Sequence, residues 1–228
     1  MAKNSDKMNA RERERQRRQK KKQEQQKQWY FYGAIGVLII AGLALFGIFN
    51  QPQPATAVDL EFVADQVIDG SPDAPIQIIE FGDFGCPACQ RWHNAGVKEL
   101  IQDTYGDQVA FTFRHFPVIT LDSPQAASAS MCAAEQEAFW PYHDYIYEQG
   151  TGLSNAELIS YATAVGIDSV QFEGCLASGK YLDYVEQDLS LARAEGARGT
   201  PTFLINGQLI ANPNFESMSN VIFSQLNG

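Results

Sequence analysis

The chain has 228 residues, of which 45% are hydrophobic and 19% are charged. This size allows one domain of ordinary length plus an appendage, and the apolar fraction is sufficient for a buried core. The formal net charge of −10 conceals a sharp division, because residues 1–28 carry eleven Lys or Arg against four acids while the rest carries six against 23. The strongly acidic remainder argues against a nucleic-acid-binding domain.

Residues 29–49 form an uninterrupted apolar segment, WYFYGAIGVLIIAGLALFGIF. As a helix, this segment would span about 30 Å, the thickness of the bilayer hydrocarbon. The basic flank on its N-terminal side places the N-terminus in the cytoplasm and the remainder outside. We therefore predict a basic cytoplasmic tail (1–28), a transmembrane helix (29–49), a linker (50–58) and an extracytoplasmic domain (59–228).

A cleaved signal peptide is the alternative interpretation of this segment. Ala55-Thr56-Ala57 resembles a cleavage site for signal peptidase, but secretory apolar regions usually run to about 7–15 residues. The longer apolar run favours a retained anchor, and both interpretations export the C-terminal domain. The basic run could also contact nucleic acid, but beside a membrane span its role is more simply to bind anionic lipid headgroups.

The exported domain alternates between strand and helix patterns. The predicted elements are a strand at 75–81, a helix from Cys89 to Gly106, a strand at 109–116, a block of helices within about 122–198, a hairpin at 202–210 and a helix at about 214–226. Asn206-Gly207 is a strong two-residue hairpin turn. This order predicts a mixed α/β sheet that is interrupted by one helical insertion.

Cys86 and Cys89 enclose Pro87 and Ala88 where the first strand gives way to a helix. Two cysteines at this spacing on a first helical turn can close a disulfide. Unpaired N–H groups and the helix dipole would stabilise a thiolate at Cys86, and proline suits the first helical position. The pattern predicts a redox pair in which Cys86 exchanges with substrate and Cys89 resolves the mixed disulfide.

Other chemistries use similar cysteine spacings. Covalent haem attachment requires a histidine directly after the second cysteine, where this chain has Gln90. A zinc site could add His93 to the two cysteines, but no second clustered pair supplies the fourth ligand. A purely structural disulfide is disfavoured, because so short a loop removes little entropy. We therefore expect no metal and no cofactor beyond the Cys86–Cys89 disulfide.

Three motifs together resemble the DsbA-like thiol–disulfide oxidoreductases. They are Glu80-Phe-Gly-Asp-Phe-Gly-Cys-Pro-Ala-Cys89, Phe113-Arg-His-Phe-Pro117 and Gly199-Thr-Pro-Thr-Phe203, and they occur in the family's order. The resemblance covers residues from about 60 to 226. It implies an α/β thioredoxin fold with an inserted helical subdomain, here preceded by the transmembrane helix.

The resemblance also implies roles for individual residues. Pro201 would be a cis proline against the Cys86–Cys89 disulfide, and Thr200 would offer backbone hydrogen bonds to a bound substrate chain. Glu80 matches a buried acid near the second cysteine, which with a raised pKa could shuttle the Cys89 proton. Its alternative role is that of a polar residue at the end of a strand. The chain departs from the best-known member of the family in having Ala88 where an imidazole would help to stabilise the thiolate.

The remaining cysteines and histidines receive simpler interpretations. Cys132 and Cys175 lie in different predicted helices, and in an oxidising compartment we favour a structural disulfide between them over two free buried thiols. His93 is expected on the surface of the helix that follows Cys89. His115 and His143 flank aromatic residues and are expected to be packing residues.

The predicted function is disulfide introduction into exported proteins that carry reduced cysteines. By resemblance, a quinone-linked membrane partner, DsbB-like or VKOR-like, would reoxidise the Cys86–Cys89 pair. One alternative is a membrane-tethered reductase, for example for cytochrome c maturation. The other is a thioredoxin-fold binding module whose disulfide is inert.

Overall fold

The computed structural model describes residues 67–150 and 152–228. The predicted tail, transmembrane helix and linker lie outside the described residues. Within residues 67–150 and 152–228, no helix is both long and apolar enough to cross a bilayer.

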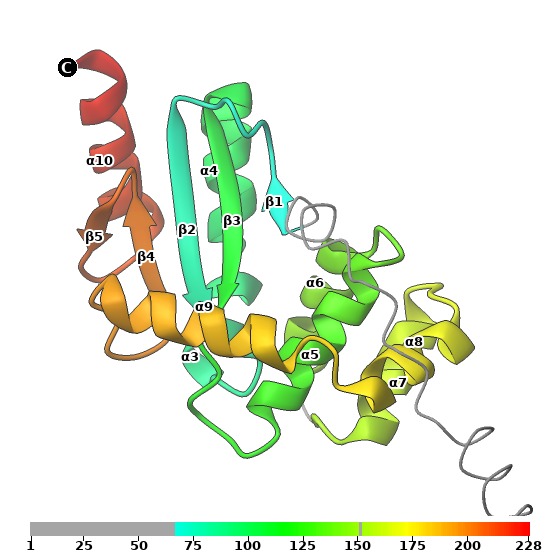
Figure 1. Ribbon diagram of the computed structural model, residues 1–228. Coiled ribbons are helices and arrows are strands. Elements are labelled where there is room, and N and C mark those ends of the chain that lie inside the picture. The colour runs from blue at the N-terminus through cyan, green and yellow to red at the C-terminus, as the bar shows by residue number, and fades with distance from the viewer. Residues whose placement is uncertain (1–66, 151) are drawn as a thin grey trace, which may run out of the picture. The chain divides into compact units, whose positions relative to one another are not determined.

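A five-stranded sheet forms the centre of the described domain, with the order β1-β3-β2-β4-β5 (Figure 1). Its strands are β1 (Ile68–Asp69), β2 (Ile76–Gly82), β3 (Val109–His115), β4 (Thr202–Ile205) and β5 (Gln208–Ile210). β2 runs parallel to β3, whereas the pairs β1–β3, β2–β4 and β4–β5 are antiparallel. The central strand β2 therefore brings its carboxyl end, where the cysteine motif begins, between β3 and β4.

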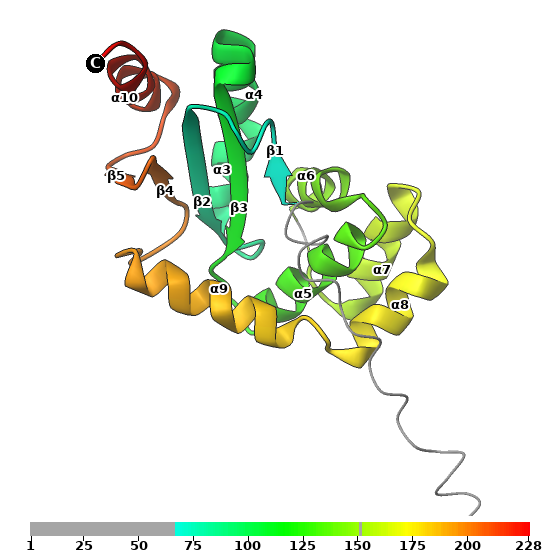
Figure 2. The ribbon, with the colours of Figure 1, turned by 45° about the horizontal axis from the view of Figure 1, so that its top comes forward.

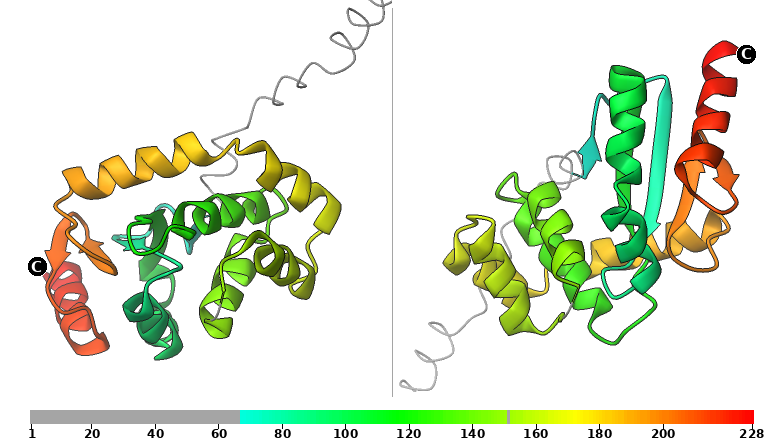
Figure 3. Two further views of the ribbon diagram at one scale, coloured as in Figure 1. Left: turned by 90° about the horizontal axis from the view of Figure 1, so that it is seen from below. Right: turned by 180° about the vertical axis from the view of Figure 1, so that it is seen from behind.

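Helices cover both faces of this sheet. One face carries α3 (Pro87–Asn94), α4 (Val97–Tyr105) and α10 (Phe215–Asn227), and the other carries α9 (Leu182–Ala194), as Figures 1 and 3 show. Side chains alternate along β2, so that Ile76 and Ile78 join the core under α4 and α10 while Phe81 packs with residues of α9. Glu80 has the same parity as Ile76 and Ile78 and therefore points toward the face that carries α3.

The helical insertion packs around a second core, beside the sheet (Figure 2). Its helices are α5 (Ser123–Ala134), α6 (Phe139–Gln149), α7 (Asn155–Ala164) and α8 (Ser169–Ser178), after which α9 returns the chain to the sheet. Ser154 and Glu157 form a capping box at the start of α7, and Asp168 accepts hydrogen bonds from Val170 and Gln171 at the start of α8. The core of the insertion includes residues of the cysteine motif, which therefore lies between the two packed regions.

The structure corrects the predicted elements in two places. The helix expected from Cys89 to Gly106 is two helices, α3 and α4, because the chain turns at Ala95-Gly96 and Gly96 adopts a left-handed conformation with φ 66°. The short strand β1 was not predicted, since two residues are too few to show an alternating pattern.

Candidate active site at the start of α3

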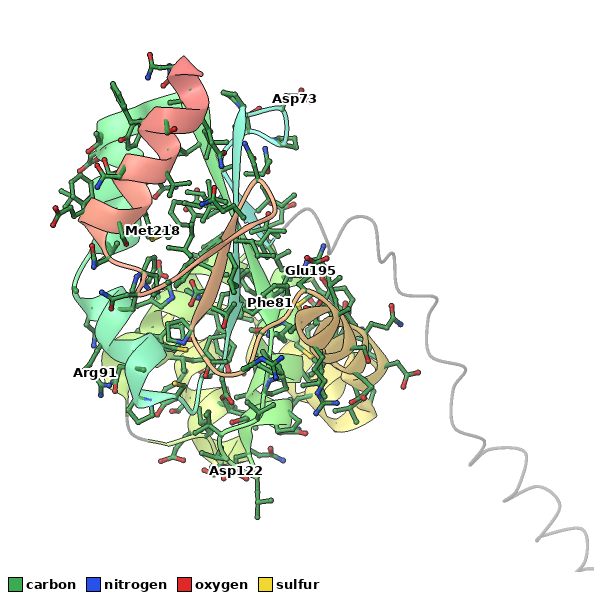
Figure 4. The ribbon with its side chains drawn as sticks, turned by 90° about the vertical axis from the view of Figure 1, so that its left-hand side faces the viewer. Asp73, Phe81, Arg91, Asp122, Glu195 and Met218 are labelled. Atoms are coloured by element: carbon green, nitrogen blue, oxygen red, sulfur yellow. A yellow bond between two sulfur atoms is a disulfide. The ribbon has the colours of Figure 1, made fainter. Side chains whose placement is uncertain are left out.

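Cys86 is the N-cap residue of α3, and Pro87 is the first residue of the helix. The first helical hydrogen bond runs from Gln90 N–H to the Cys86 carbonyl, at 3.1 Å. In Figure 4, Arg91 on α3 and Asp122 before α5 lie at the same end of the molecule, and Asp73 before β2 lies at the other. The cysteine motif is therefore presented at the carboxyl end of β2, with Cys86 at the positive end of a helix dipole.

Asp83, which the sequence analysis did not single out, holds the loop before Cys86 in place. Its buried carboxylate accepts hydrogen bonds from Gly85 N–H (2.7 Å) and from the N–H groups of Val118 (2.7 Å) and Ile119 (2.8 Å). A Cβ at Gly85 would lie 2.7 Å from the Ser123 hydroxyl, so this close approach requires glycine. The 118–121 loop and the cysteine motif are thus fastened to each other by one carboxylate.

The thiol of Cys86 is almost buried and lies against the Thr200–Pro201 peptide bond, which is cis as the resemblance implied. Its Sγ is 3.3 Å from the Thr200 carbonyl oxygen. Hydrogen bonding from the Cys89 thiol lowers the pKa of Cys86 to about 5; burial opposes this, and the Thr200 side chain assists it. The Thr200 hydroxyl is buried without another partner among the described residues, so it is free to donate to a Cys86 thiolate.

Cys89 has the opposite environment, although both cysteines are free thiols. Its side chain is fully buried, and burial raises the pKa of the Cys89 thiol far above its ordinary value. The hydrogen bond to Cys86 and the negative charge of Glu80 act in the same direction. The reduced centre therefore holds one thiolate, Cys86, and one thiol, Cys89.

Glu80 is buried, as expected, and its partner is a residue that the sequence analysis placed wrongly. His93 Nε2 lies 3.1 Å from both carboxylate oxygens of Glu80, and the His93 side chain is only 6% exposed. The prediction that His93 lies on the helix surface was wrong. Its spacing could have corrected this, because residues four apart share a helix face and Cys89 points into the core.

His115 and His143 are packing residues surrounded by aromatic rings, as expected. Burial lowers the pKa of His115 to about 3 and that of His143 to about 4, so both are neutral at pH 7. His93, His143 and Asp144 have ligand atoms within 4.8 Å of one another and are the one group in the described part of the chain that could hold a metal ion. Neither Cys86 nor Cys89 belongs to that group.

A pocket of ≈ 390 Å³ opens beside Cys86. It lies between the start of α3, the loop before α5 and the end of α6, and Phe84, Thr120 and Tyr147 contribute to its walls. The adjacent 118–121 loop exposes apolar side chains, of which Leu121 is fully exposed. The space next to the Cys86 sulfur is therefore partly apolar and open, and can admit a side chain of an extended polypeptide.

Cys132 and Cys175 form a disulfide between α5 and α8, inside the insertion. The two positions are 43 residues apart in the chain. Both residues are buried, and neither lines the pocket beside Cys86.

Comparison with known proteins identifies a family and relatives that share this domain. The thioredoxin family model Thioredoxin_4 matches residues 63–223. The probable disulfide bond formation protein D of Bacillus anthracis is 31% identical over 205 residues, which are 85% of this chain and 93% of that protein. The crystal structure of oxidised BdbD from Bacillus subtilis superposes with a TM-score of 0.67 at 25% identity, covering 72% of this chain and 94% of that one.

A different kind of relative shares the same domain. The Na⁺/H⁺ antiporter NhaA of Herminiimonas arsenicoxydans is 32% identical over 187 residues. These residues are 76% of this chain but 30% of the antiporter, so the chain spans under a third of that relative's length.

Proposed function

Because the chain belongs to the thioredoxin family and, within it, to the disulfide bond formation D proteins, which are thiol–disulfide oxidoreductases, we propose that it oxidises paired thiols of exported proteins. The stabilised Cys86 thiolate carries this proposal. A low pKa at Cys86 favours the reduced form of the centre, and a centre whose reduced form is stabilised is a strong oxidant. The hydrogen bond from the Cys89 thiol supports that thiolate although Ala88 provides no imidazole.

The catalytic cycle begins with the oxidised Cys86–Cys89 disulfide. A substrate thiolate attacks Cys86 Sγ, the bond to Cys89 breaks, and a mixed disulfide forms between the substrate and Cys86. A second substrate thiolate attacks this mixed disulfide, and Cys86 leaves as a stable thiolate. Two electrons pass to the protein, and the substrate gains a disulfide.

The N-terminal sequence supports a proposal for where this reaction takes place and which kind of protein reoxidises the cysteine pair. The apolar segment 29–49 and its basic flank support a single membrane anchor with an extracytoplasmic catalytic domain. A quinone-linked membrane protein of the DsbB or VKOR kind would take the two electrons and reform the Cys86–Cys89 disulfide. Protease added to intact cells should then cleave the catalytic domain and spare the basic tail, whereas full protection of the domain would contradict this topology.

A refolding assay tests the proposed direction. Oxidised full-length protein in detergent is mixed with a reduced, unfolded substrate protein, and recovery of native substrate and loss of free thiols are followed. We expect one substrate disulfide per Cys86–Cys89 pair, and none from a Cys86→Ala variant. Transfer only from the dithiol form to substrate disulfides would indicate a reductase, and absence of exchange in either direction would leave a binding module.

A further inference from the structure

The buried position of Cys89 creates a need for proton transfer. Cys89 leaves as a thiolate when the disulfide is reduced, yet in the reduced centre it is a thiol, so it must gain a proton each time. It must lose that proton again when the disulfide reforms. Its sulfur is shielded from water, so the proton has to pass through a neighbouring group.

Glu80 is the nearby acid whose charge acts on Cys89, but it cannot exchange protons with water directly. Its side chain is only 3% exposed. Within the described part of the chain, its hydrogen-bond partner is Nε2 of His93, which is equidistant from both carboxylate oxygens at 3.1 Å. Any proton that leaves or reaches Glu80 along hydrogen bonds therefore passes through the His93 ring.

His93 connects this buried acid to the surface. Its ring is stacked on Tyr147 with the centroids 4.4 Å apart, and it borders a second pocket together with Asn94, Asp144 and Glu148. No hydrogen bond among the described residues engages Nδ1, the other ring nitrogen. One nitrogen of His93 thus meets Glu80, and the ring reaches a pocket that is open to water.

The other titratable groups around His93 are poor carriers of this proton. His143 and Tyr147 on α6 stay neutral, because burial lowers the pKa of His143 to about 4 and raises that of Tyr147 well above its usual range. Asp144 accepts a hydrogen bond from His143 Nδ1 at 2.7 Å. Asp83, in the loop after β2, is engaged by backbone N–H groups. Histidine is the side chain suited to proton exchange near neutral pH.

We propose that His93 links Glu80 to solvent, so that the proton exchanged by Cys89 enters and leaves through Glu80 and His93 at the pocket between α3 and α6. The inference rests on the proposed thiol–disulfide exchange. His93 does not touch the reacting sulfurs and is therefore a positioning residue that acts through Glu80.

The proton balance closes over one cycle. When the Cys86–Cys89 bond breaks, Cys89 keeps the electron pair. Nδ1 of His93 takes a proton from water, Nε2 passes its proton to Glu80, and Glu80 passes a proton to Cys89 and is again a carboxylate. When the disulfide reforms, each transfer runs backwards and Nδ1 releases a proton to water. The imidazole returns to its first tautomer, so no ring rotation is required.

The test is the single-turnover reduction of the oxidised full-length protein by a dithiol peptide, followed by tryptophan fluorescence from pH 5 to 8. His93→Gln keeps a donor for Glu80 but cannot relay a proton. We expect it to slow reduction at pH 7 by about a hundredfold, the lower end of what positioned proton transfer contributes. His143→Asn, which keeps a donor for Asp144, is the matched control and should match the wild type.

Chemical rescue separates proton transfer from a structural effect. Imidazole in the buffer should restore most of the rate of His93→Ala, which opens the pocket toward Glu80, and should not restore Glu80→Gln. A His93→Gln rate within twofold of the wild type would overturn the proposal, and so would a slow His93→Ala that imidazole leaves unchanged. A wild type that exchanges no disulfides would refute the proposed function itself, which is a separate outcome.

Discussion

The two cysteine pairs of this chain lie in opposite environments. Cys86 and Cys89 are three positions apart at the start of a helix, with one sulfur beside an open pocket and a stabilised thiolate. Cys132 and Cys175 are 43 positions apart and are bonded between two helices inside an apolar core. The same side chain serves exchange chemistry in one region and cross-linking in the other.

The difference shows that reactivity depends on what surrounds the sulfur. A cross-link that closes a short loop adds little stability, so the Cys86–Cys89 bond can open without unfolding the domain. A cross-link that closes a long loop adds much more stability. Hydrogen-bond donors and a helix N-terminus stabilise a thiolate, and Cys86 has both.

The largest effect is expected from Cys86→Ala. This variant should lose all exchange with substrate thiols, because the attacked sulfur is gone, while the domain remains folded. Thiol titration of the substrate and circular dichroism measure the two properties. Residual exchange would mean that another cysteine reacts with substrate, which would erase the distinction between the pairs.

The converse variant is Cys132→Ala with Cys175→Ala. Removing this disulfide, which joins positions 43 residues apart, should lower the free energy of unfolding by about 3–4 kcal/mol, as measured by denaturant titration. Single-turnover exchange at Cys86 should remain within a few-fold of the wild type. A large loss of exchange in a folded double variant would show that the second disulfide takes part in the chemistry.

A pH titration sharpens the comparison further. The pKa of Cys86 falls from an ordinary 9.0 to about 5 in the folded protein, so the thiolate stabilises the reduced fold fully above pH 9 and loses that effect as pH falls through about 5. The reduced centre binds two protons below pH 5 and one above it. The reduction potential should therefore fall by about 59 mV per pH unit below pH 5 and by about 30 mV above it.

The change in the slope of reduction potential against pH reports Cys86 and not the second pair, because the disulfide-bonded Cys132 and Cys175 do not titrate. The absorbance of the reduced protein at 240 nm should report the same midpoint near pH 5. A single slope of about 59 mV from pH 4 to 8 would mean that both cysteines stay protonated, contrary to the stabilised thiolate.

The smallest effect concerns Ala88, the residue between the two cysteines. Ala88→His would place an imidazole near the Cys86 thiolate, and we expect the potential to rise by roughly 30 mV, a tenfold change in the exchange equilibrium. Ala88→Gln adds comparable bulk without a cationic form and serves as the control. An equal shift in both variants would assign the effect to packing instead of charge.

Local patterns in the sequence were enough to predict much of the fold and of the candidate active site. Cys86 and Cys89 were identified from their spacing after a strand, and the hairpin around Asn206-Gly207 from its turn residues. The pairing of Cys132 with Cys175 followed from the even number of cysteines. Pro201 and Glu80 needed the family resemblance, because a cis bond and a buried acid leave no periodic signal.

What was missed depends on contacts between segments distant in the chain. The Glu80–His93 pair joins a strand to a helix, and the insertion packs against the His93 ring through His143. Asp83 matters because its carboxylate reaches backbone groups 35 and 36 residues away. A single sequence shows neither contact, although the four-residue spacing of Cys89 and His93 indicates that they share a helix face.

The central claim, that the Cys86–Cys89 centre is an oxidant, is tested most directly by its equilibrium reduction potential. The full-length protein is equilibrated with defined ratios of reduced and oxidised glutathione at pH 7, and the fraction of reduced Cys86 is measured. We predict a potential above about −180 mV, in the range of disulfide donors. A potential near −270 mV, in the range of thioredoxin, would contradict the claim and identify a reductase.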